Sequence, residues 1–169
     1  MANLKKFVKW FDLCAAALAL IALLLMFAPA IAYKDPDASL STFNGFQTIF
    51  GYSESNTVGG STVTTYYIDF SFMNFLTFIF TVAAIVLLVL NNFGKGFKFL
   101  NLVAAGLLLV AGVFFFLTLA FTIAHRAEAY GIVTYGIDKS DWHLGVGAIL
   151  SGVFAILGAC VSGCKLLIK

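Results

Sequence analysis

Four long apolar stretches without charged residues dominate the pattern of hydrophobic and polar positions along the chain. They cover residues 13–32, 70–90, 99–124 and 144–164. A bilayer core of about 30 Å needs about 20 apolar residues in helical conformation, and each stretch supplies that length. A charged residue at the centre of such a helix costs about 2.5–3.5 kcal/mol, so its absence is typical of membrane spans. We therefore predict four transmembrane helices.

The polar segments between these stretches differ in charge, which predicts their sidedness. Seven of the ten Lys and Arg residues precede the first span, separate the second from the third, or follow the fourth. The segments 33–69 and 125–143 hold seven of the eight acidic residues instead. Basic segments stay in the cytoplasm. We therefore expect both termini inside a plasma membrane, which we expect to be bacterial, and the loops 33–69 and 125–143 outside.

The start of the chain allows a second interpretation. Basic residues, an apolar run and Ala-Ile-Ala at 30–32 also describe a signal peptide with its cleavage site. The apolar run 13–32 is longer than the usual 7–15 residues of a signal-peptide core, so we expect it to be retained as a span. Cleavage would leave three spans with the same sidedness.

The predicted fold is an all-α membrane protein, in which one domain over residues 1–169 forms an antiparallel four-transmembrane-helix bundle. Composition agrees, because 62% of the residues are hydrophobic and 11% are charged, against about 25% charged in soluble domains. The connections are too short to hold a soluble catalytic domain. The net charge of +2 gives no reason to expect nucleic acid as a partner.

The first outer loop, residues 33–69, should add a small extracellular element to the bundle. Asn44 and Gln47 have the spacing of an N-cap and its reciprocal partner, which predicts a short helix ending at Gly51. Residues 62–68 are rich in β-branched and aromatic residues and predict a strand. A hairpin that pairs 46–52 with 62–68 is the alternative to the helix.

Small residues recur on one face of the fourth span and predict a helix-packing seam. Such residues let helix backbones approach closely in lipid, where no hydrophobic force drives helices together. The seam residues are Gly147, Ser151, Gly152, Ala155, Ala159 and Gly163. We expect this face to pack on the first and third spans, and the alternative is self-association or a partner protein.

The three cysteines, Cys14, Cys160 and Cys164, map to the predicted cytoplasmic ends of the first and fourth spans. We interpret them as small apolar residues within the packing seam. A copper or zinc site, a redox pair and juxtamembrane acylation are the alternatives.

Candidate chemistry is sparse, and we predict neither a catalytic residue nor a cofactor. A zinc site could form only if the connection between the third and fourth spans folded back on itself. Its candidate ligands are His125, Glu128, Asp141 and His143. Their spacing matches no metal-binding motif.

Three classes of function remain open. The first is a non-enzymatic interaction, accessory or structural subunit that contacts the lipid bilayer and binds a partner protein through the outer loop, with Phe46, Ile49, Phe50, Tyr66 and Tyr67 as contact residues. The second is a small transporter or channel subunit for passive permeation. The polar residues available for its path are Asn74, Thr77, Thr81, Asn101, Thr118, Thr122 and Ser151. A membrane enzyme or metal-binding protein is the third.

The order of a long first outer loop and a shorter second one is similar to the outline of claudin-like tetraspan proteins. The paired loop cysteines of claudins are absent from both outer loops of this chain. The resemblance is therefore one of outline, and it assigns no family.

Overall fold

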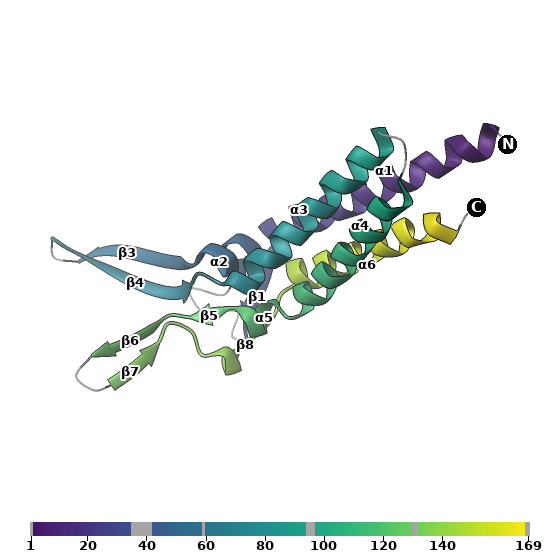
Figure 1. Ribbon diagram of the computed structural model, residues 1–169. Coiled ribbons are helices and arrows are strands. Elements are labelled where there is room, and N and C mark those ends of the chain that lie inside the picture. The colour runs from purple at the N-terminus through teal and green to yellow at the C-terminus, as the bar shows by residue number, and fades with distance from the viewer. Residues whose placement is uncertain (1, 35–41, 59, 94–96, 130–131, 168–169) are drawn as a thin grey trace.

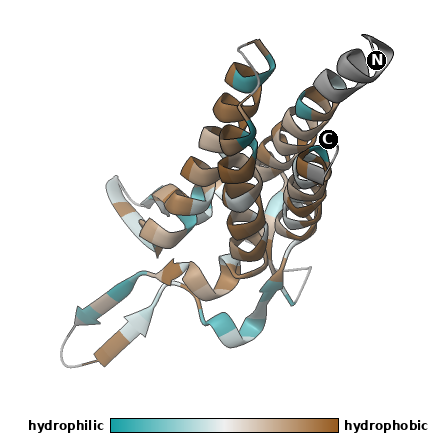
Figure 2. Cartoon of the chain, turned by 45° about the vertical axis from the view of Figure 1, so that its right-hand side comes forward, coloured by the Kyte–Doolittle hydropathy of each residue, from teal (hydrophilic) through white to brown (hydrophobic). Residues whose placement is uncertain are grey.

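The structure is a computed structural model that describes residues 2–34, 42–58, 60–93, 97–129 and 132–167. Its four long helices are α1 (Ala2–Leu24), α3 (Phe72–Phe93), α4 (Lys98–Phe116) and α6 (Val146–Leu167). They are long and apolar enough to cross a membrane, as expected of a multi-pass membrane protein. Figure 2 shows that most residues of these helices are hydrophobic.

The helices pack side by side in the cyclic order α1, α3, α4, α6, so that each contacts two neighbours. The start of α1, the end of α3 and the end of α6 lie at one end of the helices, which we call the terminal end (Figure 1). All of the strands lie at the other end, the strand end. Small residues and two leucines fill the helix contacts near the terminal end. They are Ala15, Ala16, Ala19, Ala84, Leu88, Ala104, Leu108 and Ala159.

The strand end holds short helices and several strands in addition to the predicted helices, so the chain is mostly helical but not all-α. The strands are β1 (Pro29–Tyr33), β2 (Thr42–Asn44), β3 (Tyr52–Val58), β4 (Ser61–Asp69), β5 (Ile123–Ala124), β6 (Arg126–Ala129), β7 (Ile132–Tyr135) and β8 (Trp142–Leu144). The short helices are η1 (Leu25–Phe27), α2 (Gly45–Phe50), α5 (Thr118–Phe121) and η2 (Lys139–Asp141).

The strands form three small sheets, in the orders β2-β1-β8, β3-β4-β5 and β6-β7. All of the pairings are antiparallel. The first sheet ties the end of the first span to the segment before the fourth, through pairs such as Ile31 with Leu144. The second joins the β3–β4 hairpin to the end of the third span, because Ile68 pairs with Ala124. Backbone pairing thus links all of the connections at this end.

Two predicted spans are too long at the strand end. The first was predicted to reach residue 32, but α1 ends at Leu24 and Pro29 begins a strand. Proline has no amide hydrogen to donate and disfavours helix in the residue before it, so the chain leaves the helix there. The third was predicted to reach residue 124, but α4 ends at Phe116 and Thr122 is extended.

The short helix predicted in the first outer loop is present as α2, with the predicted cap. The Gln47 amide donates to Asn44 Oδ1 (2.9 Å), and the Asn44 amide donates to Gln47 Oε1 (2.8 Å). Gly51 ends the helix with φ of +89°, and a Cβ there would lie 2.7 Å from the Ile68 carbonyl oxygen. Helix and hairpin therefore coexist. The strand that pairs with β4 is Tyr52–Val58, however, and not residues 46–52 as the alternative had it.

Candidate functional site

An apolar cluster at the strand end fixes the bases of the strands. It consists of Ile31, Phe43, Ile68, Ile137 and Trp142, which come from separate parts of the chain. The Phe43 and Trp142 rings stack with their centroids 4.9 Å apart. Burial of such large side chains stabilises this end by about 1.5–3 kcal/mol for each residue. The strands therefore project from a packed base.

Two β hairpins extend from this base and diverge from one another (Figure 1). In β3–β4 the residues at the start of β4, 61–66, are all exposed, and in β6–β7 all four residues of β7 are exposed. Several of these side chains are large and apolar or aromatic. The exposed fraction is 56% for Val63, 53% for Tyr66, 66% for Ile132 and 62% for Tyr135. Of these four residues, Tyr66 and Tyr135 line the same groove between the hairpins.

A groove of about 630 Å³ separates the two hairpins. Its lining is uncharged apart from one histidine. The lining residues are Thr64, Thr65 and Tyr66 of β4, His125, Ala127 of β6, and Thr134, Tyr135 and Gly136 at the end of β7. Hydroxyl groups, aromatic faces and a few methyl groups are the contacts that this groove offers to a ligand.

His125 holds the two hairpins together at the bottom of the groove. Its Nδ1 lies 2.9 Å from Asp69 Oδ1, and its ring lies against that of Tyr66, with 5.1 Å between the centroids. Its backbone amide donates to the Tyr67 carbonyl (3.0 Å), and its carbonyl accepts from the Gly136 amide (2.8 Å). A Cβ on Gly136 would lie 2.5 Å from the Tyr67 carbonyl oxygen, so a larger residue would separate the hairpins.

The structure does not bring the four candidate zinc ligands together. His125 pairs with Asp69, while Glu128 lies 3.8 Å from Arg126 in an exposed ion pair. Asp141 and His143 are exposed at the other side of the base, next to β1. Among the described residues no group of three or more His, Cys, Asp and Glu side chains could hold a metal ion.

The five residues predicted to contact a partner differ in exposure. Phe50 and Tyr66 are exposed, at 57% and 53%. Ile49 is buried, and Phe46 and Tyr67 are half-buried and pack on neighbouring aromatic rings. Sequence reasoning named residues of α2 and β4 in the first outer loop and overlooked β7, whose Ile132 and Tyr135 are more exposed. The β-branched and aromatic residues of 132–135, which favour a strand, are the signal that could have found them.

The polar residues considered for a permeation path are all buried. Their side chains form hydrogen bonds that hold the backbone and the helices together. Four of them, Thr77, Thr81, Thr118 and Thr122, donate to a carbonyl three or four residues earlier in the chain. Ser151 donates across to the Ala22 carbonyl (2.8 Å), which ties α6 to α1.

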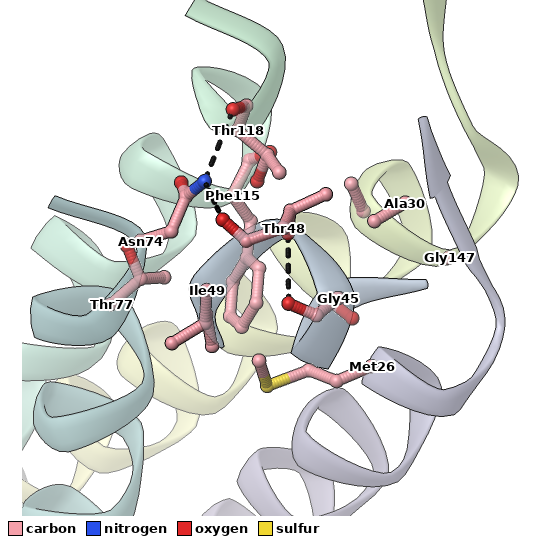
Figure 3. Close-up of a pocket in the computed structure, with 12 residues that line it drawn as sticks. Met26, Ala30, Gly45, Thr48, Ile49, Asn74, Thr77, Phe115, Thr118 and Gly147 are labelled. Atoms are coloured by element: carbon pink, nitrogen blue, oxygen red, sulfur yellow. Dashed lines mark hydrogen bonds between the residues drawn. The ribbon is translucent and has the colours of Figure 1, made fainter. Parts of the chain in front are cut away.

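Asn74 lines a small cavity beneath α2, shown in Figure 3. Its Nδ2 lies 3.1 Å from the Thr48 carbonyl oxygen and 3.4 Å from that of Thr118. The cavity has a volume of about 10 Å³ for the centre of a water-sized sphere, so it leaves room for about one water molecule. A site of this size binds no solute larger than water in this conformation.

A buried polar network at the terminal end escaped sequence reasoning. Asp12 of α1 is 1% exposed, and its Oδ2 pairs with Nζ of Lys165 on α6. Asn91 of α3 donates to the same oxygen (3.3 Å) and to Oδ1 of Asn101 on α4. Ser162 of α6 donates to the Asn101 carbonyl (3.2 Å). All four long helices therefore contribute to one network.

The signal for this network was in the charge pattern. Asp12 is the one acidic residue among the seven basic residues of the predicted cytoplasmic segments, and it directly precedes the first apolar stretch. Lys165 directly follows the last one. A charged residue beside a span is usually solvated, so the pattern alone did not distinguish a buried pair from two surface residues.

The small-residue face of α6 packs on α1 and α4, with one exception among its six residues. A Cβ on Gly152 would lie 2.8 Å from the Phe116 ring, and one on Gly147 would lie 2.7 Å from the Ala28 carbonyl oxygen. Ser151, Ala155 and Ala159 are buried. A Cβ on Gly163 would meet nothing within 4 Å, so this residue lies outside the contact. Gly158, which the pattern omitted, lies against Leu108 and the Ala15 carbonyl.

The interpretation of the cysteines as seam residues is wrong. Cys14, Cys160 and Cys164 are all free and exposed. They lie on the outward faces of α1 and α6, because the faces toward the neighbouring helices are taken by alanine, glycine and serine. Sequence spacing placed the cysteines near the correct helix ends but on the face of each helix that packs against its neighbours.

The connection η2 before the fourth helix carries two shifted titratable groups. The Ser140 amide and hydroxyl lie against Asp138 and lower the pKa of its carboxyl group, with the amide to Oδ1 at 3.0 Å. Partial burial lowers the pKa of Lys139, whose Nζ donates to the Ala120 carbonyl (3.0 Å). The side chains of Asp138 and Lys139 thus form hydrogen bonds that hold this turn against the Ser140 amide and the Ala120 carbonyl.

Comparison with known proteins found no matching family model, curated protein or solved structure. The class that the fold and the site define is a multi-pass membrane protein with paired β hairpins at one end of its helices.

Proposed function

We propose that the protein is a non-enzymatic interaction or accessory subunit of a bacterial plasma membrane. Its helices form an antiparallel four-helix bundle in the bilayer, with both termini in the cytoplasm. The β3–β4 and β6–β7 hairpins lie outside the cell, where they bind a protein partner. The positive-inside distribution of the basic residues supports this orientation, because the strand end carries most of the acidic residues.

The observation that carries the proposal is the pair of exposed hairpins on a packed base. Chains that only anchor themselves in a membrane need no ordered strands beyond it. Here an apolar cluster and three antiparallel sheets position exposed apolar and aromatic side chains around a groove. Rigid presentation of exposed residues lowers the entropic cost of binding a partner.

Passive permeation is supported less well. The polar side chains between the helices are mostly hydrogen-bonded to backbone carbonyls, and the cavity among them accepts about one water molecule. At the terminal end the buried ion pair of Asp12 and Lys165 lies between α1 and α6.

The proposal can be tested by photo-crosslinking in intact cells. A photoreactive amino acid is placed at Thr57 of β3, at Ile132 of β7, and at Val86 on the outward face of α3 as a control. We expect Thr57 and Ile132 to capture the same defined protein, identified by mass spectrometry, and Val86 to capture lipid. Capture of lipid alone at all three positions, together with solute flux into liposomes, would contradict the proposal in favour of permeation.

A further inference from the structure

One edge of β4 has no backbone partner over most of its length. On its first edge β4 pairs with β3 along the whole hairpin, from Ser61 to Ile68. On its second edge β5 pairs only with Ile68 and Asp69. Among the described residues, the last backbone hydrogen bond on that edge joins the His125 amide to the Tyr67 carbonyl. Among the described residues, this second edge of β4 therefore has no strand partner over residues 61–66, and its part at Thr64, Thr65 and Tyr66 lines the groove.

The hairpin register indicates which amides face the groove. Val58 pairs with Ser61 across a two-residue turn, so the bonded pairs along the hairpin alternate from there. The amides of Thr62, Thr64 and Tyr66 then point away from β3. The contact between Ser55 Oγ and Thr64 Oγ1 (2.9 Å) agrees, because side chains approach most closely in the non-bonded pairs.

This edge lacks the features by which proteins usually block strand addition. Natural edge strands carry lysine, proline or inward-pointing charges, or are covered by another element. Residues 52–68 contain neither lysine nor proline, and Glu54 of β3 is their single charged residue. On the groove side, the hydroxyl, aromatic and methyl groups of Thr134, Tyr135 and Ala127 lie opposite the edge.

We propose that the groove binds one extended, uncharged segment of the partner protein, which adds to β4 as a further strand. The proposal rests on the proposed function and specifies its site. An extended polypeptide is the ligand whose alternating amide and carbonyl groups match an open strand edge. Alternate side chains of the segment enter the groove, where Thr, Ser and Val fit the uncharged lining.

A second copy of this chain in the same membrane is the alternative occupant of the position. Neighbouring strands lie about 4.8 Å apart, and the bound strand would have to lie directly beside β4. Each helix is about 10 Å wide, and the bundle is two helices across in both directions. A second copy could enter the groove only by placing one of its own hairpins between β4 and the β6–β7 hairpin, with its own bundle beside this one in the membrane. We therefore assign the position to a segment of the partner protein, and binding of a second copy is an outcome of the test.

The experiment uses two proline variants that differ in which edge they affect. Thr64→Pro removes an amide that faces the groove, whereas Ser55→Pro removes one from the opposite, outer edge of β3. The two residues are cross-strand partners, so both variants lose the same hydroxyl contact and perturb the same part of the hairpin. The probe is a displayed library of random linear 12-residue peptides, selected on the full chain in lipid nanodiscs.

We expect the selected peptides to be uncharged and to bind Thr64→Pro about tenfold or more weakly than the unaltered chain. Their affinity for Ser55→Pro should stay within about twofold, since one hydrogen bond accounts for about a factor of ten. A second measurement keeps the test valid if Thr64→Pro unfolds. Two versions of each peptide are compared, one methylated at the odd-numbered amides and the other at the even-numbered amides. Methylation should abolish binding in one version and spare it in the other.

Equal loss of affinity in both variants, insensitivity to amide methylation, or selection of no peptide would overturn the inference. So would crosslinking of Thr64 to a second copy of the chain. These outcomes leave the proposed function standing if Thr57 and Ile132 still capture one protein in cells. If neither hairpin captures a protein in cells, the proposed function itself is wrong, whatever the result of the peptide experiment.

Discussion

At the scale of single residues, the buried pair of Asp12 and Lys165 is the feature with the largest consequence for stability. A carboxylate that is 1% exposed needs its cation, because an unpaired charge in a low-dielectric interior is costly. Asn91 and Asn101 extend the network, so each of the four long helices contributes at least one polar group at this level. The network therefore fixes the register of the helices at the terminal end.

We predict that Lys165→Met destabilises the protein by about 3–5 kcal/mol, because it leaves the Asp12 carboxylate buried without its partner. The double variant Asp12→Asn, Lys165→Met should recover most of this loss. Lys98→Met is the matched control, since Lys98 is exposed at the start of α4. Unfolding free energies measured in bicelles check the prediction, and equal values for Lys165→Met and Lys98→Met would refute it.

The N-terminal cap of α2 is a second feature at the scale of single residues. Asn44→Ala should lower the unfolding free energy by about 1 kcal/mol, because the Gln47 amide loses its acceptor. Asn56→Ala, in an exposed position of β3, serves as the control. Hydrogen exchange at the Gln47 amide should accelerate only in Asn44→Ala, and unchanged exchange there would show that the cap does not hold the helix.

At the scale of elements, α6 is the helix whose sequence is most constrained by its neighbours. Its glycines let it approach α4 and α1 so closely that side chains larger than hydrogen would collide with rings and carbonyl groups. In a bilayer such packing, and not the hydrophobic effect, holds helices together. The outward face of α6 carries larger residues such as Leu150 and Leu157.

Gly152→Leu should therefore lower the temperature of aggregation in detergent, whereas Leu150→Phe should leave it nearly unchanged. The first substitution drives a side chain into the Phe116 ring, and the second enlarges a residue that is already 38% exposed. Similar aggregation temperatures for the two variants would mean that this face of α6 is not a packing contact.

The three cysteines belong to the same argument, since their outward position removes them from every helix contact. Replacing Cys14, Cys160 and Cys164 together by alanine should change the unfolding free energy by less than about 0.5 kcal/mol, as is usual for surface positions. A loss of about 2 kcal/mol or more would show that at least one of them is packed.

At the scale of the whole molecule, the four apolar helices could be predicted from sequence, because length and composition alone specify them. The capped helix α2 was also predictable, since a local hydrogen-bond pattern of Asn44 and Gln47 determines it. The strands that follow α1 and α4 were not predictable, because only pairing with distant segments, such as that of Ile31 with Leu144, stabilises them.

The candidate site also divides into features that the local sequence specifies and features that depend on distant contacts. Tyr66 was found as an exposed aromatic residue of a predicted strand, but β6, β7 and the groove were not. Their positions depend on His125, which joins residues far apart in sequence through Asp69 and the Tyr67 carbonyl. The pair of Asp12 and Lys165 is separated by nearly the whole chain, so no local pattern could reveal it.

The central claim is that both hairpins face the outside of the cell, and thiol labelling in intact cells tests it most directly. In the variant without native cysteines, single cysteines are introduced at Ser55, Ser140 or Lys98, all of which are exposed. The account predicts that an impermeant thiol reagent labels Ser55→Cys and Ser140→Cys in intact cells and labels Lys98→Cys only after lysis. Labelling of Lys98→Cys in intact cells, with protection of the other two, would contradict it.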